Sequence, residues 1–233
     1  MSEREAFLRG FHAAHPGITS AVLARGTSYD RLAALVPAGA RVLDLGCGDG
    51  YLLAKTGGIG IDLSAAELAI ARRRGATVVQ GRAQALPFAD GAFDLCVCHL
   101  ALMLMDELDV VAREIARVAR SFAAVLGGGP TASGDDAFHR FLGLPLATIP
   151  RLGDRRASSE ADWRALFPGF AIDFERLELD LSGPADDVWR VLDASYQRGA
   201  TRAQFDAVTA DLVVDGQLPL AMVVWLARAR NRS

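Results

Sequence analysis

Short apolar runs and amphipathic stretches alternate along residues 41–130. Each apolar run ends at glycine or at polar residues, as a buried strand does where it enters a turn. The helix expected at 65–74 has Ser64 as its N-cap, and the helix expected at 107–122 carries apolar residues at spacings of three and four. Five strands are predicted, at residues 41–46, 57–63, 77–80, 93–98 and 122–126. This alternation indicates a parallel sheet with helices on both faces.

The pattern changes after residue 130. Residues 131–157 are rich in glycine, proline, aspartate and arginine, so they form either a lid or a long surface connection. Further along, the sequence predicts a helix from Ser158 or Ser159 through residue 167, a strand at 170–181, helices at 184–198 and 201–214, and a last strand at 220–227.

Composition and charge limit the classes of function. Hydrophobic residues make up 51% and charged residues 23% of the 233 residues, which is typical of a globular protein. No apolar run approaches the roughly 20 residues that span a bilayer, and the N-terminus is charged where a secretory signal is apolar. The net charge of −3 disfavours contact with phosphate backbones. Neither a membrane nor a nucleic acid is therefore expected as a partner.

The cysteines and the basic residues bear on the source and the compartment. Cys47, Cys96 and Cys98 have neither the number nor the spacing of a disulfide framework or a zinc site. A reduced, cytoplasmic protein without a metal is expected. Lys55 is the one lysine among 25 basic residues, and this excess of arginine suggests GC-rich codons and a bacterial source.

The most informative segment is VLDLGCGDG, at residues 42–50. Gly46, Gly48 and Gly50 follow a predicted strand, where glycine permits a sharp turn and a close approach of a ligand to the backbone. Asp44 lies inside the strand and needs donors, which a ligand ammonium group could supply. Asp62 ends the next strand, where an acid can accept hydrogen bonds from ribose hydroxyls. Alternatively, the two acids only cap the neighbouring loop and helix.

Four segments in order carry a family resemblance: VLDLGCGDG, GIDLS, VVQGRAQALPFADGAFDLCVC and REIARVAR. Together they cover roughly residues 40–128 and resemble the class I S-adenosylmethionine-dependent methyltransferases, most closely the small-molecule group called methyltransferase type 11. The resemblance implies an α/β, Rossmann-like fold. Its seven-stranded, mostly parallel sheet has the order 3-2-1-4-5-7-6, with an antiparallel last strand, helices on both faces and an N-terminal helical cap.

The same resemblance implies an enzyme and a division of the chain. The enzyme would transfer a methyl group from S-adenosyl-L-methionine to O, N or C of a small-molecule acceptor, leaving S-adenosyl-L-homocysteine. We expect a single domain with a cap or lid at 1–38, a cofactor-binding core at 39–130, and an acceptor-side insertion with C-terminal strands at 131–233. A non-catalytic or regulatory protein that binds the adenosyl ligand is the alternative. An NAD-dependent oxidoreductase is disfavoured, because the spacing is G-x-G-x-G and not G-x-G-x-x-G.

By this resemblance, the methionine part of the cofactor meets Gly46, Cys47 and Gly48, with Asp44 nearby. Asp62 would hold the ribose. The adenine would pack on the side chain that follows, Leu63.

The adenine edge departs from the family pattern. An Asp-Ala pair usually stands after the third strand, and its acid holds the adenine amino group; here the pair is Arg82-Ala83. Arginine cannot accept that hydrogen bond, so only the backbone at Ala83 carries over. We expect the Arg82 side chain to point to solvent or to stack on the ring edge.

His99 follows the fourth strand, at the sheet edge where ligands bind in open parallel sheets. It is a candidate general base that would remove a proton from the acceptor. It could equally be a wall of the cofactor pocket, and in both cases we expect the acceptor or the cofactor to be its partner. Tyr29, in the N-terminal segment, would approach the methionine end. Four downstream residues either line the acceptor pocket or belong to the core: Phe138, His139, Phe141 and Trp163.

Overall fold

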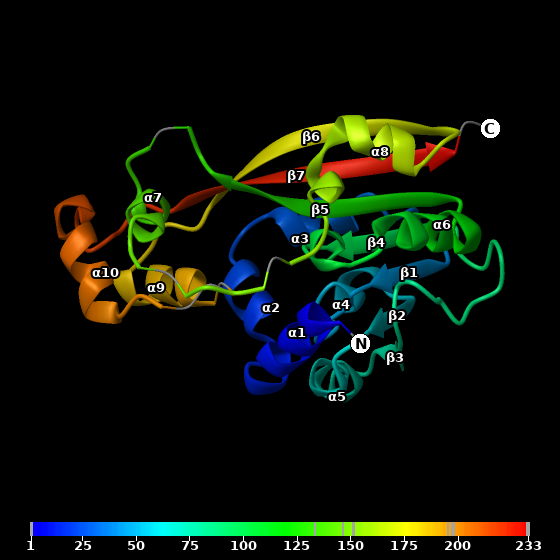
Figure 1. Ribbon diagram of the computed structural model, residues 1–233, viewed down its shortest axis with the longest axis horizontal. Helices are drawn as coiled ribbons and strands as arrows, with labels where there is room; N and C mark the ends of the chain where they lie inside the picture. Colours follow the sequence, from blue (N-terminus) through cyan, green and yellow to red (C-terminus); the bar gives the residue numbers. More distant parts are fainter. Residues whose placement is uncertain are drawn as a thin grey trace.

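The strands of the computed structural model form one seven-stranded sheet (Figure 1). The structure describes residues 2–132, 134–145, 147–150, 152–194, 196 and 199–231. The strands are β1 (Val42–Leu45), β2 (Ile59–Asp62), β3 (Thr77–Gln80), β4 (Leu95–His99), β5 (Ser121–Pro130), β6 (Phe170–Asp180) and β7 (Ala221–Asn231). Their order is β3-β2-β1-β4-β5-β7-β6, with β1 to β5 parallel and β7 antiparallel to both of its neighbours. The expected sheet order and antiparallel last strand are confirmed.

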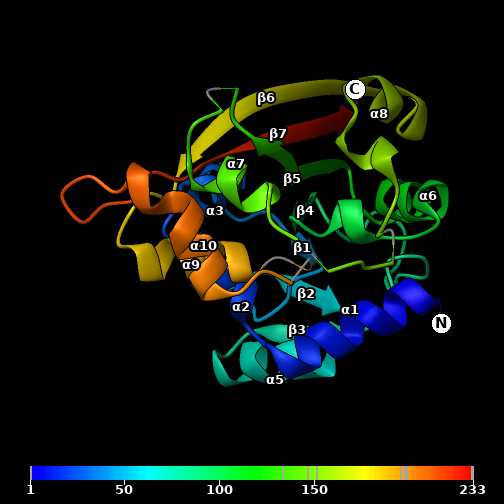
Figure 2. The same cartoon turned by 60° about the vertical axis from the view of Figure 1, so that its left-hand side comes forward.

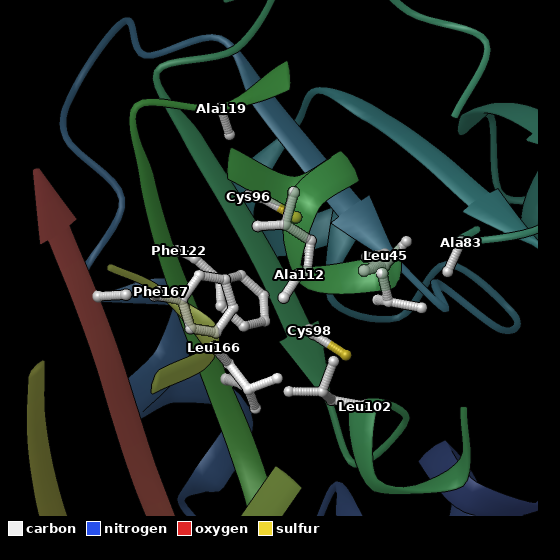
Figure 3. Close-up of a cluster of buried hydrophobic side chains, with 14 of the residues drawn as sticks. Leu45, Ala83, Cys96, Cys98, Leu102, Ala112, Ala119, Phe122, Leu166 and Phe167 are labelled. Carbon is white, nitrogen blue, oxygen red and sulfur yellow. The ribbon is translucent and has the colours of Figure 1, made fainter. Parts of the chain in front are cut away.

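Successive residues of the central strands pack on opposite faces of the sheet, because side chains alternate along a strand. On one face, Cys96, Cys98 and Phe122 pack with α6 (Leu108–Val118) and α8 (Glu160–Leu166), as Figure 3 shows for part of this cluster. The other face is covered by α3 (Ser28–Ala33), α9 (Ala185–Asp193) and α10 (Arg202–Thr209). Burial on both faces explains why the short central strands are almost wholly apolar.

The boundary between α6 and β5 differs from the sequence prediction. The helix ends at Val118, four residues before its predicted end, and Ala119 already has extended backbone (φ −132°, ψ 144°). Phe122 lies inside the sheet, with its ring stacked 5.3 Å from that of Trp163. Its apolar character therefore reflects the strand and not the helix face. β5 continues to Pro130, beyond the predicted 126, because β7 pairs with it from Ser121 to Pro130, with a shift in register between Gly127 and Gly129.

Several short helices follow β5 in the chain. α7 (Ala137–Leu142) contacts α9 and α10, and a short 3-10 helix, Arg155–Ser158, packs against β5. Figure 1 shows α7, α9 and α10 grouped at one end of the molecule. The predicted loop at 131–157 and helix at 184–198 extend over residues outside the description, namely 133, 146, 151, 195, 197 and 198.

Three helices precede the sheet: α1 (Glu3–Ala14), α2 (Ile18–Leu23) and α3. Figures 1 and 2 both show α1 next to α5 (Ala65–Arg73), and the two helices are in contact. The expected N-terminal helical cap is therefore present. Among the described residues, no helix has both the length and the apolar character needed to cross a membrane.

Candidate functional site

The turn after β1 is built from glycines that adopt left-handed backbone. Gly46 has φ 71° and Gly48 has φ 51°, values that other residues rarely adopt. A Cβ at Gly46 would lie 2.5 Å from the Cβ of Ala101, so the turn passes directly against the loop after β4. The backbone N–H groups of Gly46 and Cys47 both donate to the carbonyl of Ile61, at 2.8 and 3.1 Å. These hydrogen bonds fix the turn to β2, and the close approach of Ala101 leaves no room for a side chain at Gly46.

Two adjoining cavities flank this turn at the carboxyl ends of β1, β2 and β4. The first, the apolar lobe, has a volume of about 130 Å³, and the second, the polar lobe, about 90 Å³. The apolar lobe is lined by Leu8, Ile61, Leu63, Ala83, Leu104 and Met105, together with Glu5 and Arg82. The polar lobe is lined by Asp44, Asp49, Glu67, Tyr29, Tyr51, His99 and Tyr196. Both lobes share Gly46, Asp62 and His12, so they form one continuous site.

Asp44 is the most unusual group in the site. It lies in β1, is 1% exposed, and its Oδ2 is buried with no hydrogen-bond partner among the described residues. Burial, with smaller contributions from the neighbouring carboxylates of Asp62 and Asp49, raises the pKa of this carboxyl to about 8. A buried carboxyl without a donor is costly, so this atom invites a ligand donor.

Asp62 joins the glycine turn to the next helix. Its Oδ2 accepts from the Gly48 N–H at 2.9 Å, and its Oδ1 accepts from the Ser64 N–H at 2.8 Å. Burial raises the pKa of Asp62, and the two backbone hydrogen bonds oppose that shift. Each oxygen keeps a second lone pair, so Asp62 can hold the turn and still accept from a ligand in either lobe.

Glu67 is a site residue that the sequence did not reveal. It lies in the first turn of α5, is buried, and its carboxylate accepts from the Gly17 N–H. Its Oε1 lies 2.8 Å from Nδ1 of His12, whose Nε2 meets the Tyr196 hydroxyl at 3.1 Å. These contacts fasten the end of α1 over the polar lobe. In the sequence, an acid three residues after Ser64 reads only as a helix-start residue.

Asp49 is the second acid found by the structure. It is buried, accepts a short hydrogen bond from the Ser20 hydroxyl, and forms an ion pair with Arg74 at 2.9 Å. It therefore ties the glycine turn to α2. Both of these contacts join segments more than twenty residues apart, which no local sequence pattern encodes.

His99 is the last residue of β4, whereas the sequence predicted that it follows the strand, and its partners are protein groups. Its Nε2 lies 2.9 Å from the Ser28 hydroxyl, and its ring stacks on Tyr29 with centroids 3.6 Å apart. The expectation that the acceptor or the cofactor would be its partner is thus incomplete, because α3 supplies one. Burial lowers the pKa of His99 to about 3, so the ring is neutral at ordinary pH. Tyr29 lines the polar lobe beside Asp44, and burial raises the pKa of its hydroxyl.

The Arg82 side chain is exposed to solvent, as one of the two expectations had it, but it is also held by an ion pair. Its Nη2 forms an ion pair with Oε1 of Glu5 at 2.5 Å, which links the segment after β3 to helix α1. Ala83 and Leu63 line the apolar lobe beside this pair, and Cys47 lines the polar lobe. The sequence could not foresee the partner, because Glu5 and Arg82 are 77 residues apart.

Several residues singled out from the sequence lie away from both lobes. Trp163 and Phe141 are buried in the two core clusters, and Phe138 packs against one of them. His139 pairs with Asp136 at the start of α7. Within the described ranges, no group of three or more His, Cys, Asp or Glu side chains is placed to hold a metal ion.

Comparison with known proteins gives a partial sequence match. Residues 43–125 match the family model of the methyltransferase domain. The malonyl-[acyl-carrier protein] O-methyltransferase of Pectobacterium atrosepticum is 39% identical over 103 residues, which cover 40% of this chain and 41% of that protein. The chain thus spans about two fifths of the length of this curated relative.

Solved structures match over most of the chain. The YcgJ protein of Bacillus subtilis is 20% identical with a TM-score of 0.58, over 88% of this chain and 99% of that one. A candidate methyltransferase from Bacillus halodurans is 18% identical with a TM-score of 0.60, over 89% and 100% of the two chains. At these identities the likeness shows the fold.

Proposed function

We propose that this chain, whose residues 43–125 belong to the class I S-adenosylmethionine-dependent methyltransferases, methylates a small-molecule acceptor with S-adenosyl-L-methionine. The observation that carries the proposal is the unpartnered Oδ2 of Asp44, buried beside the Gly46 turn in the polar lobe. An ammonium group such as that of the methionine moiety supplies the donors that this atom lacks.

The other residues of the site fit the rest of the cofactor. Asp62, which faces both lobes, has lone pairs for the ribose hydroxyls. Leu63, Ala83 and Met105 give the apolar lobe walls suited to a flat ring. When bound, the cofactor supplies an electrophilic methyl group on a sulfonium centre. The chain's own contribution is to bind, orient and shield the reactants.

A small acceptor suits the polar lobe, which three tyrosines and the cap helices enclose. The ring of His99 is a weak base, because its pKa is about 3. We therefore infer that the chain accelerates transfer mainly by holding the acceptor in line with the methyl donor. An acceptor that arrives already nucleophilic needs no protein base.

Calorimetry with S-adenosyl-L-methionine, S-adenosyl-L-homocysteine and NAD tests the binding part of this proposal. We expect both adenosyl ligands to bind and NAD not to bind. Asp44→Asn, which keeps the size of the side chain but removes the carboxylate, should lower the affinity for both adenosyl ligands by about tenfold or more. Binding of NAD, or of neither adenosyl ligand, contradicts the proposal.

Turnover tests the catalytic part. Transfer of labelled methyl should be measured across a metabolite panel of amines, alcohols, carboxylates and malonyl thioesters; the last are included because of the name of the Pectobacterium relative. We expect transfer to at least one panel member, with S-adenosyl-L-homocysteine formed in equal amount. Ligand binding without any turnover would favour the alternative, a regulatory protein that binds the adenosyl ligand.

A further inference from the structure

Helix α1 places a carboxylate inside the apolar lobe. Glu5, Leu8, Arg9 and His12 recur at helical spacing and all line this cavity, so one face of α1 forms its roof. Within this face, Glu5 is 7% exposed although it belongs to the first turn of a terminal helix. The roof therefore buries a carboxyl group in a cavity that is lined by both apolar and polar side chains.

Two contacts fix the orientation of the Glu5 carboxylate. Its Oε1 accepts from Arg82 at 2.5 Å, and its Oε2 accepts from the Ser2 N–H at 3.3 Å. The Ser2 contact belongs to a capping box, which a solvent-facing glutamate would form equally well. The Arg82 contact has no such local cause, since Arg82 comes from the segment after β3 and lines the same lobe. The pair is thus built into the cavity and is not merely a helix cap.

The far end of α1 is also held in place. Nδ1 of His12 lies 2.8 Å from Oε1 of Glu67, and the Gly17 N–H, just beyond the end of α1, donates to the same carboxylate. With Glu5 held by Arg82 at one end and His12 by Glu67 at the other, the roof has a fixed position over the lobe. A carboxylate on it can therefore select among ligands, because its oxygens do not move freely.

We propose that Glu5 recognises the exocyclic amino group of the ring bound in the apolar lobe, and that Arg82 positions the carboxylate for this contact. The inference rests on the proposed function, in which that ring is the adenine of an adenosyl ligand. An ionised carboxylate only accepts hydrogen bonds, so it favours a ring that carries an amine over one that carries a carbonyl at the same place. A mismatched carbonyl oxygen would leave both groups buried without a donor between them.

The test compares S-adenosyl-L-homocysteine with S-inosyl-L-homocysteine, in which a carbonyl oxygen replaces the amino group. We expect wild-type protein to bind the adenosyl ligand at least about tenfold more tightly, as expected for one hydrogen bond to a charged group. Glu5→Gln keeps the capping box and gains a donor. This variant should lose affinity for the adenosyl ligand and bind the inosyl ligand at least as well as before. The ratio of the affinity for the adenosyl ligand to the affinity for the inosyl ligand should therefore fall toward one.

Further variants separate recognition from positioning. Arg82→Ala should lower the ratio because the carboxylate loses its support, and Arg82→Lys should restore part of it. Glu3→Gln is the matched control: it changes an exposed glutamate in the same helical turn that lines neither lobe, and should leave the ratio unchanged. Thermal melts of each variant show whether the fold is kept.

The outcomes distinguish this inference from the proposed function. A wild-type ratio near one, or an unchanged ratio in Glu5→Gln, overturns the role of Glu5 while ligand binding stands. If wild-type protein binds neither ligand, the proposed function is overturned and the inference with it. A ratio that falls in Glu5→Gln but not in Arg82→Ala overturns the positioning role of Arg82 alone.

Discussion

At His99, burial decides the chemistry more than the position at a strand end does. The ring is covered by Tyr29, meets the Ser28 hydroxyl, and has its pKa lowered to about 3. A general base works best when its pKa is near the working pH, so this ring is poorly matched to proton removal. The same contacts make it a firm wall between the sheet and the cap helix α3.

We therefore expect His99→Gln to keep turnover within about tenfold of wild type and to weaken cofactor binding. The rate should show no acidic limb near pH 6.5, because the buried ring stays neutral down to about pH 3. Steady-state kinetics against pH check both points, with His15→Gln as a control outside both lobes. A loss of kcat of about 10²–10⁴ with intact cofactor affinity would instead identify His99 as the general base.

At the scale of elements, the side chain of Asp62 connects the end of β2, the glycine turn and the start of α5. Asp62 accepts from Gly48 on one side and from Ser64 on the other. Asp62→Ala should weaken the binding of S-adenosyl-L-homocysteine by roughly 1.5–3 kcal/mol, the range for hydrogen bonds to a charged group. It should also lower the free energy of unfolding by about 1 kcal/mol, because the turn and the helix start lose their acceptor.

Asp180→Ala is the matched control for Asp62→Ala. Asp180 accepts from the Ser182 N–H at 2.9 Å in the same local arrangement, but it lines neither lobe. Calorimetry and urea denaturation on both variants separate binding from stability. If the affinity of Asp62→Ala is unchanged while its stability falls, Asp62 serves only the backbone.

The elements also show what the sequence could and could not predict. The sequence predicts strands such as β1 and β3 to within a residue or two, because short apolar runs followed by glycine are a local signal. The end of α6 was wrong because Phe122 fits a helix face and a strand equally well. Glu5, Glu67 and Asp49 were missed as site residues because their roles depend on contacts with distant segments, which the fold creates.

In the molecule as a whole, the sheet and its helices bury apolar groups on both faces, while two ionisable groups whose pKa is strongly shifted by burial line the polar lobe. Asp44 and His99 are the clearest pair, one with a raised and the other with a lowered pKa. Such shifts lower the stability of the ligand-free protein over particular ranges of pH. A site prepared for a ligand should therefore be visible in the pH dependence of unfolding.

The direction of each contribution follows from proton binding. His99 has a pKa near 6.5 when unfolded and about 3 when folded, so its contribution to stability is lost as the pH falls from 6.5 to 3. Asp44 has a pKa near 3.8 when unfolded and about 8 when folded, so its contribution is lost as the pH rises from 3.8 to 8. Between 3.8 and 6.5 the two slopes oppose each other and cancel. Above 6.5 only the slope of Asp44 remains.

We expect the free energy of unfolding to fall by about 2 kcal/mol between pH 6.5 and 8 in wild-type protein because of Asp44. In Asp44→Asn this fall should disappear, since the amide does not titrate. Urea denaturation at closely spaced pH values measures both curves, and their difference isolates Asp44 from every other group. Saturating S-adenosyl-L-homocysteine should also flatten the wild-type curve, because an ammonium group at Asp44 favours its ionised form. Parallel curves for wild type and Asp44→Asn would show that this carboxyl is not held protonated in the folded protein.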